Sequence, residues 1–222
     1  MATLHVLRVF CSITGEFGNP LGVFLDGSAV PRERRQEIAA DLNFSETVFV
    51  DDRPRGGIDM YTPAAPIPFA GHPLVGTAWL LKKEDGACEE LNPPAGRVPV
   101  RHSEEMTFFS APPAWSPDFK LVRLGDPADV DALRPGDFTD DVYAWAWIDE
   151  AAGAVRARSF VPSFGISEDE ATGSAALALS AELGRPITVR QGRGSVITAR
   201  PFDGGLVEIG GRVVAEEVRD YS

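Results

Sequence analysis

Two short segments of the sequence place polar side chains beside glycines in the same order, once in each half of the chain. They read Gly71-His72-Pro73-Leu74-Val75-Gly76-Thr77-Ala78 and Glu168-Asp169-Glu170-Ala171-Thr172-Gly173-Ser174-Ala175. When His72 is aligned with Asp169, Gly76 falls on Gly173, and each segment continues into an Ala/Leu-rich stretch typical of a helix. Two helix starts facing one cleft would combine converging backbone N–H groups with two positive dipole ends. The repeat therefore predicts a site that binds a carboxylate and stabilises developing negative charge.

The carboxyl group of Glu46 is the first candidate for proton transfer. It lies in Ser45-Glu46-Thr47, beside four apolar residues, Phe44, Val48, Phe49 and Val50. Apolar surroundings disfavour the charged carboxylate, so they raise its pKa toward the range of a general base. The alternative is a Glu that faces outward from an edge strand.

His72 and Asp169 are the second and third candidates. Gly71 lets the backbone approach a ligand closely, and Pro73 suits the first helical position, where no N–H is needed. His72 would then hold or relay a proton near the helix start. Each residue has a structural alternative: a buried or capping histidine, and an acid that only caps a helix. The segment Thr172-Gly173-Ser174 adds a hydroxyl and a small residue suited to a bound carboxylate.

The elements expected around these residues are many short strands and one main helix in each half of the chain. Helices are expected at 32–42, 126–133 and 168–183 and after His72, and strands at 4–10, 21–25, 44–50, 58–62, 97–102, 106–110, 120–124, 142–148, 155–161, 187–190, 195–201, 206–209 and 212–217. This pattern predicts an α+β fold with an N-terminal lobe at 1–110 and a shortened C-terminal lobe at 111–222. The last strand, near 207–222, is expected to pack back onto the first lobe.

Charge, apolar runs and cysteine spacing argue against several classes of protein. The 222 residues carry a net charge of −12, which argues against a nucleic-acid partner because phosphate contacts need clustered Lys and Arg. The N-terminal residues do not resemble a signal peptide, and no apolar run is long enough for a membrane span. The two cysteines, Cys11 and Cys88, have no metal-site spacing, and we expect reduced thiols in a cytoplasmic protein.

Four segments, in this order along the chain, resemble the PhzF family of phenazine biosynthesis-like isomerases. They are Gly18-Asn19-Pro20-Leu21-Gly22-Val23, Leu42-Asn43-Phe44-Ser45-Glu46-Thr47-Val48-Phe49, Ala70-Gly71-His72-Pro73 and Glu168-Asp169-Glu170-Ala171-Thr172-Gly173-Ser174-Ala175. The resemblance implies a diaminopimelate epimerase-like fold: two pseudo-symmetric lobes, each a curved, mostly antiparallel sheet wrapped around a central helix. It further implies a homodimer that uses no cofactor and no metal and binds neither nucleic acid nor membrane.

The resemblance also implies roles for individual residues. Glu46 falls on the acid/base that removes a proton from carbon and returns it elsewhere, with His72 and Asp169 as its polar partners. Ser45, Gly71, Gly173 and Ser174 fall where a small carboxylate substrate, cyclic or amino-acid-like, is held. The sequence departs from the family pattern at Glu170, where proline is common, and in the length of the second lobe. Two other functions stay open: a binding protein that has lost catalysis, and an amino-acid racemase that uses thiols.

Overall fold

The computed structural model describes residues 2–221 and shows an α+β fold, as the sequence predicts. The α-helices are α1 (Arg32–Leu42), α2 (Gly71–Asp85), α3 (Pro127–Asp131) and α4 (Gly173–Leu183). The strands of the first half are β1 (Ala2–Cys11), β2 (Asn19–Phe24), β3 (Glu46–Asp52), β4 (Gly57–Tyr61), β5 (Pro66–Ile67), β6 (Glu90–Leu91), β7 (Val98–His102) and β8 (Thr107–Ala111). Those of the second half are β9 (Lys120–Arg123), β10 (Val142–Asp149), β11 (Ala154–Val161), β12 (Ile166–Asp169), β13 (Ile187–Gln191), β14 (Ser195–Phe202) and β15 (Leu206–Tyr221).

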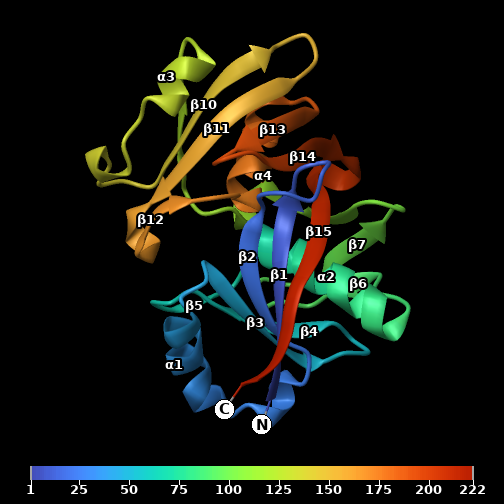
Figure 1. The fold of residues 1–222 in the computed structure, drawn as a ribbon. Coiled ribbons are helices and arrows are strands. Elements are labelled where there is room, and N and C mark those ends of the chain that lie inside the picture. The colour runs from blue at the N-terminus through green and yellow to red at the C-terminus, as the bar shows by residue number, and fades with distance from the viewer. Residues whose placement is uncertain (1, 222) are drawn as a thin grey trace.

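The strands are joined into one mixed sheet by its C-terminal strand. The sheet follows the order β5-β4-β3-β2-β1-β15-β14-β13-β11-β10-β9. The first part of β15 pairs with β14 and β8, and its remainder pairs antiparallel with β1. In Figure 1, β15 runs from the strands of the second half down along β1 to the end of the molecule where both termini lie.

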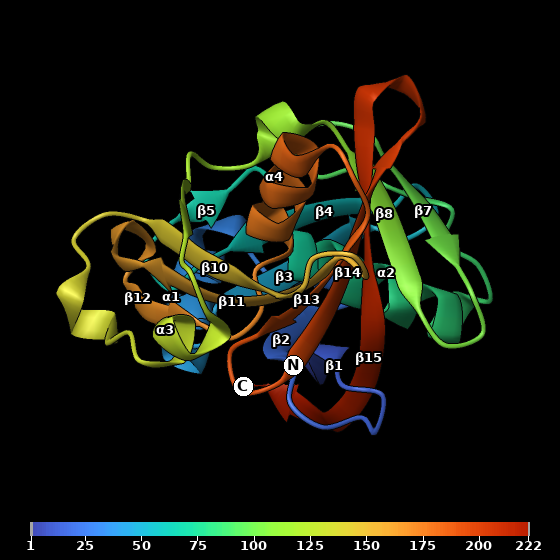
Figure 2. The same ribbon diagram turned by 90° about the horizontal axis from the view of Figure 1, so that it is seen from above.

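The two longer buried helices lie in the middle of the molecule. Helix α2 packs against β1, β2, β8 and β15, and α4 packs against β14 and β15. Seen from above, α4 stands near the centre while α3 lies at the edge (Figure 2). One apolar core includes Leu74 and Ala78 of α2 together with Ala175 and Leu179 of α4. Within residues 2–221, no helix combines the length and apolar character that crossing a membrane requires.

The predicted break in the C-terminal strand is wrong. Strands expected at 206–209 and 212–217 form a single strand that runs through Gly210 and Gly211. A Cβ at Gly210 would lie 2.1 Å from the ring of Phe108, and one at Gly211 would lie 2.3 Å from that of Phe10. These glycines leave room for aromatic rings and do not mark a turn.

The predicted start of the second buried helix is also wrong. The helix expected from Glu168 begins at Gly173, and Asp169 ends β12, where it pairs with Ser159 of β11. The acidic residues suit a helix start, but sheet pairing and the side-chain hydrogen bonds of Asp169 hold this segment extended. By contrast, His72 is the second residue of α2.

Candidate active site

Glu46 stands at the first position of β3, which runs parallel to β2 and places Glu46 beside Leu21. Its side chain is 13% exposed, and Oε2 lies 3.3 Å from Nε2 of His72, whose side chain is 3% exposed. The angles at this contact do not make a hydrogen bond, and neither atom has a hydrogen-bond partner among residues 2–221. The structure therefore brings together an imidazole and a carboxyl group that are both free to exchange a proton.

Asn19, the first residue of β2, connects the predicted site residues. Its Nδ2 donates to Oδ1 of Asp169 at 2.7 Å and to the carbonyl of Ala171 at 3.2 Å, and its Oδ1 accepts from the hydroxyl of Ser45 at 3.2 Å. These partners fix the orientation of the amide. The same Nδ2 lies 3.4 Å from Nδ1 of His72, so one ring nitrogen of the histidine lies beside Asn19 and the other beside Glu46.

Asp169 is the best-satisfied acid of the site. Besides the Asn19 amide, its carboxylate accepts from the hydroxyl of Thr172 at 2.5 Å and from that of Ser45 at 3.2 Å. Gln191 supports this turn, because its Nε2 donates to the Asp169 carbonyl and the Thr172 hydroxyl, each at 2.9 Å. Its Oε1 accepts from the Thr172 N–H and the Tyr143 hydroxyl, each at 3.1 Å.

Burial shifts the pKa of all three titratable side chains. Desolvation, together with the nearby charge of Asp169, raises the pKa of Glu46 well above its usual value. Desolvation raises the pKa of Asp169 to about 6, against the opposing effect of its hydrogen bonds from Thr172, Asn19 and Ser45. Burial lowers the pKa of His72 to about 3, so the imidazole is neutral at physiological pH.

The starts of α2 and α4 meet at two glycines. A Cβ added to Gly71 would lie 2.6 Å from Cα of Gly173, and one added to Gly173 would lie 2.9 Å from Cα of Gly71. Only glycine permits this approach, which brings the N–H groups of two first helical turns to one place. Developing negative charge on a ligand there would face two positive dipole ends.

A cavity of about 40 Å³ lies beside these groups. Glu46, Asp169, Thr172 and Ser174 supply polar groups to its wall, and the apolar part is formed by Ile67, Phe69, Ala70, Pro117, Phe119, Val161, Phe164 and Ile166. Of the other predicted site residues, His72 contacts Glu46 behind the wall, and Ser45 is engaged with Asn19 and Asp169. Gly71 and Gly173 pack on each other, so their predicted role in substrate binding stays a prediction.

Sequence reasoning gave Asn19 and Gln191 no role in the site, and it interpreted Thr172 only as a hydroxyl suited to a bound carboxylate. The Gly18-Asn19-Pro20 turn was the signal for Asn19. Arg193 is not placed to meet a substrate carboxylate in this cavity. Arg193 lies in the turn between β13 and β14, pairs with Glu170 at 3.3 Å and does not line the cavity.

The two cysteines lie outside the cavity, and both are buried and free. Burial raises the pKa of the Cys11 thiol and raises that of Cys88 to about 11. A thiol with a raised pKa is almost entirely protonated at neutral pH and supplies little thiolate, which does not favour a thiol racemase. Residues 2–221 contain no group of three or more His, Cys, Asp or Glu side chains placed to hold a metal ion.

Comparison with known proteins points to one family. The model of the PhzC-PhzF family, described as phenazine biosynthesis-like protein, matches residues 8–112. The trans-2,3-dihydro-3-hydroxyanthranilate isomerase of Pseudomonas aeruginosa is 32% identical over 76% of this chain and 75% of its own length. The isomerase of the same name from Pseudomonas fluorescens is 30% identical over 84% of each chain.

Solved structures share the fold. A putative phenazine biosynthesis PhzC/PhzF protein from Clostridium difficile aligns over 100% of both chains with a TM-score of 0.81 and 21% identity. A probable proline racemase from Agrobacterium radiobacter aligns over 100% of this chain and 93% of its own, with a TM-score of 0.63 and 13% identity.

Proposed function

This chain belongs to the PhzF family of phenazine biosynthesis-like isomerases, and on that premise we propose that it moves a proton on a small carboxylate substrate with Glu46 as the acid/base. The observation that carries the proposal is the unpartnered Oε2 of a buried Glu46 carboxyl, 3.3 Å from the imidazole of His72 and in the wall of a cavity. A carboxyl group with a raised pKa can both take and return a proton near neutral pH. No cofactor is needed in this scheme.

The surrounding residues serve each stage of the transfer. Ionised Glu46 removes a proton from a carbon next to the substrate carboxylate or to an unsaturated bond, with the neutral imidazole of His72 3.3 Å from its Oε2. The negative charge left on the substrate is stabilised by the first-turn N–H groups of α2 and α4. Protonated Glu46 then returns the proton to a different carbon, or to the other face of the same carbon.

The apolar walls suit a substrate that contains a ring or another compact, unsaturated hydrocarbon group. Phe69 and Phe119 flank the polar groups, and the apolar wall lowers the local dielectric around the transferred proton. At about 40 Å³ the cavity is smaller than a ring carboxylate, so side chains at its wall must move to admit the substrate. The substrate of the named relatives, trans-2,3-dihydro-3-hydroxyanthranilate, is a cyclic carboxylate of this class and the first candidate to test.

Solvent deuterium exchange tests the proposal. The protein is incubated in D2O with trans-2,3-dihydro-3-hydroxyanthranilate and with a panel of cyclic and amino carboxylates, and deuterium at carbon is measured by mass spectrometry. We expect exchange with the wild type, its loss in Glu46→Gln and its retention in Glu33→Gln, a control at an exposed position of α1. Exchange that persists in Glu46→Gln would contradict the role of Glu46.

Two further arms separate the alternatives. A carboxylate that stabilises the protein against heat but shows no exchange would indicate a binding protein without catalysis. Exchange that disappears in a Cys11→Ser/Cys88→Ser double variant would instead support thiol chemistry.

A further inference from the structure

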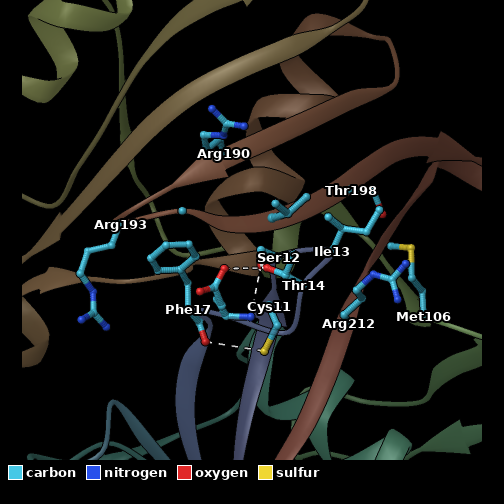
Figure 3. A pocket seen from close by; sticks show the side chains of 13 residues that line it. Cys11, Ser12, Ile13, Thr14, Phe17, Met106, Arg190, Arg193, Thr198 and Arg212 are labelled. Atoms are coloured by element: carbon cyan, nitrogen blue, oxygen red, sulfur yellow. Dashed lines mark hydrogen bonds between the residues drawn. The ribbon is translucent and has the colours of Figure 1, made fainter.

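A second hollow, of about 560 Å³, shares no lining residue with the cavity beside Glu46 (Figure 3). One wall is the loop of residues 12–17, which joins β1 to β2. The opposite wall is a face of β13, β14 and β15. Its volume lies in the range of sites that hold small organic molecules.

Strand register places cationic side chains along this sheet face. Arg190 of β13 pairs with Val196 of β14, and Thr198, two residues farther along β14, pairs with Gly210 of β15. Arg212 is two residues beyond Gly210, and alternate residues of a strand share a face. Arg193 stands in the turn between β13 and β14, so guanidinium groups surround the hollow on three sides (Figure 3).

The three arginines differ in whether an acidic side chain pairs with them. Arg193 pairs with Glu170, and Arg212 pairs with Glu105. No carboxylate within residues 2–221 forms an ion pair with Arg190. The carboxylate of Glu16 also lines the hollow, where it accepts a hydrogen bond from Thr14 at 2.7 Å. In a chain of net charge −12, this hollow gathers three guanidinium groups around one lining carboxylate.

Apolar side chains also line the hollow, beside the hydroxyls of Ser12, Thr14 and Thr198. Ile13 is 82% exposed at the loop tip, and Phe17, Met106 and Val196 complete the apolar lining. An exposed apolar surface edged by cations suits a molecule with an apolar body and one anionic group.

We propose that this hollow binds a small organic anion with an apolar body, an aryl carboxylate or aryl phosphate, with Arg190 as its main cation. A guanidinium presents paired N–H donors that match a carboxylate or a phosphate, and Arg190 has no competing acid to displace. The apolar body lies against Ile13, Phe17 and Val196. The ligand is a second molecule, bound outside the cavity that contains Glu46.

Hydrogen bonds connect this hollow to the candidate active site. Phe17 leads to Gly18, whose N–H donates to the hydroxyl of Ser195 at 2.9 Å, and that hydroxyl donates to Glu170 at 2.7 Å. Asn19, the next residue, donates to Asp169. A ligand that holds Phe17 and Arg193 therefore restrains the segment that positions the Asn19 amide.

Isothermal titration calorimetry with three probes tests the site: phenyl phosphate, inorganic phosphate and benzyl alcohol. We expect phenyl phosphate to bind the wild type at least about tenfold more tightly than either other probe, because only it has both an anion and an apolar body. Arg190→Glu should weaken phenyl phosphate binding by at least about tenfold, and Arg190→Gln, which removes the charge without reversing it, should weaken it less.

The matched control is Arg134→Glu. Arg134 is also exposed and forms no ion pair with any residue in 2–221, so its reversal changes the net charge equally at a distant position. It should leave phenyl phosphate affinity unchanged. Circular dichroism and the melting temperature establish that each variant is folded.

Three results would overturn the proposal. Equal affinities for phenyl phosphate in the wild type and Arg190→Glu would place the probe elsewhere. Equal affinities for phenyl phosphate and inorganic phosphate would indicate an adventitious anion only. A wild-type dimer that does not bind phenyl phosphate and dissociates on Ile13→Asp would make the hollow an interface between two copies of the chain.

Discussion

Acid should destabilise this protein through His72, because the folded state cannot easily protonate that ring. Burial lowers the pKa of His72 from 6.5 to about 3. Between these pH values the unfolded chain binds a proton that the folded chain does not, so this contribution to stability is lost as the pH falls from 6.5 toward 3. This change of about 3.5 in the pKa corresponds to about 5 kcal/mol in the free energy of unfolding, at about 1.4 kcal/mol for each pH unit. About 2 kcal/mol of this free energy is lost when the pH has fallen to about 5.

Asp169 acts in the opposite direction over part of the same range. Its pKa is raised from 3.8 to about 6, so the folded state binds the extra proton and this contribution to stability falls as the pH rises through about 6. The pKa of Glu46 is also raised, so Glu46 acts in the same direction as Asp169 and the wild-type pH profile mixes the effects of all three groups. A comparison with His72→Gln isolates the histidine, since both proteins keep Asp169 and Glu46.

Urea unfolding at about pH 7 and about pH 5 measures the effect. We expect the free energy of unfolding of the wild type to fall by about 2 kcal/mol more than that of His72→Gln over this interval. His5→Gln is the comparison variant. Burial also lowers the pKa of partly buried His5, but less than that of His72, so this variant should change the pH profile less than His72→Gln does. NMR of the imidazole protons supplies an independent measurement. A His72 ring that titrates near 6.5, or a gap between wild type and His72→Gln that does not change with pH, would refute the reasoning.

Three other substitutions test the frame of the site by urea unfolding. Gly173→Ala should lower the free energy of unfolding by about 1–3 kcal/mol, because its Cβ would lie 2.9 Å from Gly71 and 3.1 Å from the ring of Phe10. The control is Gly136→Ala, whose added Cβ meets nothing within 4 Å. Equal stability of the two variants would contradict this prediction. Ser195→Ala should lower the free energy of unfolding by about 1–3 kcal/mol, because it leaves the Gly18 N–H without its acceptor. Ser167→Ala, at an exposed position, should leave the free energy of unfolding unchanged. Equal losses in the two variants would show that water replaces the Ser195 hydroxyl. Arg35→Met should cost about 3–5 kcal/mol, since Arg35 is 2% exposed and pairs with Asp51 and Asp59. Arg32→Met should cost less than about 1 kcal/mol, because Arg32 pairs with the same two acids but is 70% exposed. Similar losses of unfolding free energy in Arg35→Met and Arg32→Met would mean that burial does not set the strength of these pairs.

Local pattern was enough to predict the fold class and most elements. Helix α1 occupies the predicted range 32–42, because no residue inside it opposes a helix and Asn43, in the left-handed conformation, ends it. The two errors, β12 and the continuous β15, share a cause. In both, residues with a strong local preference are held extended by contacts that this preference does not reveal. Asp169 pairs with Ser159 of β11 and accepts a hydrogen bond from Asn19, and Gly210 and Gly211 pair with β8.

The sequence was enough to single out the titratable residues that the structure brings together, but not their hydrogen-bonded support. Glu46, His72 and Asp169 are titratable, and each can be identified as a candidate from its own residue type and its immediate neighbours in the sequence. Asn19 is equally buried, yet its role depends on a contact with Asp169 across 150 residues of sequence. A lone Asn in a turn carries no sign of that partner, so only the pairing of distant strands reveals it.

The similar sequences around His72 and Asp169 lead to unlike environments, and that difference gives Glu46 its chemistry. On the α2 side, the imidazole offers Glu46 a contact at 3.3 Å without a good hydrogen bond. On the other side, the Asp169 carboxylate accepts from Asn19, Ser45 and Thr172. Two nearby buried carboxyl groups do not both ionise easily, and the one with more donors keeps the charge. The proton therefore rests on Glu46, the member of the pair that faces the neutral imidazole and lines the cavity. Under the proposed function, Glu46 must lose this proton before it can take one from the substrate carbon.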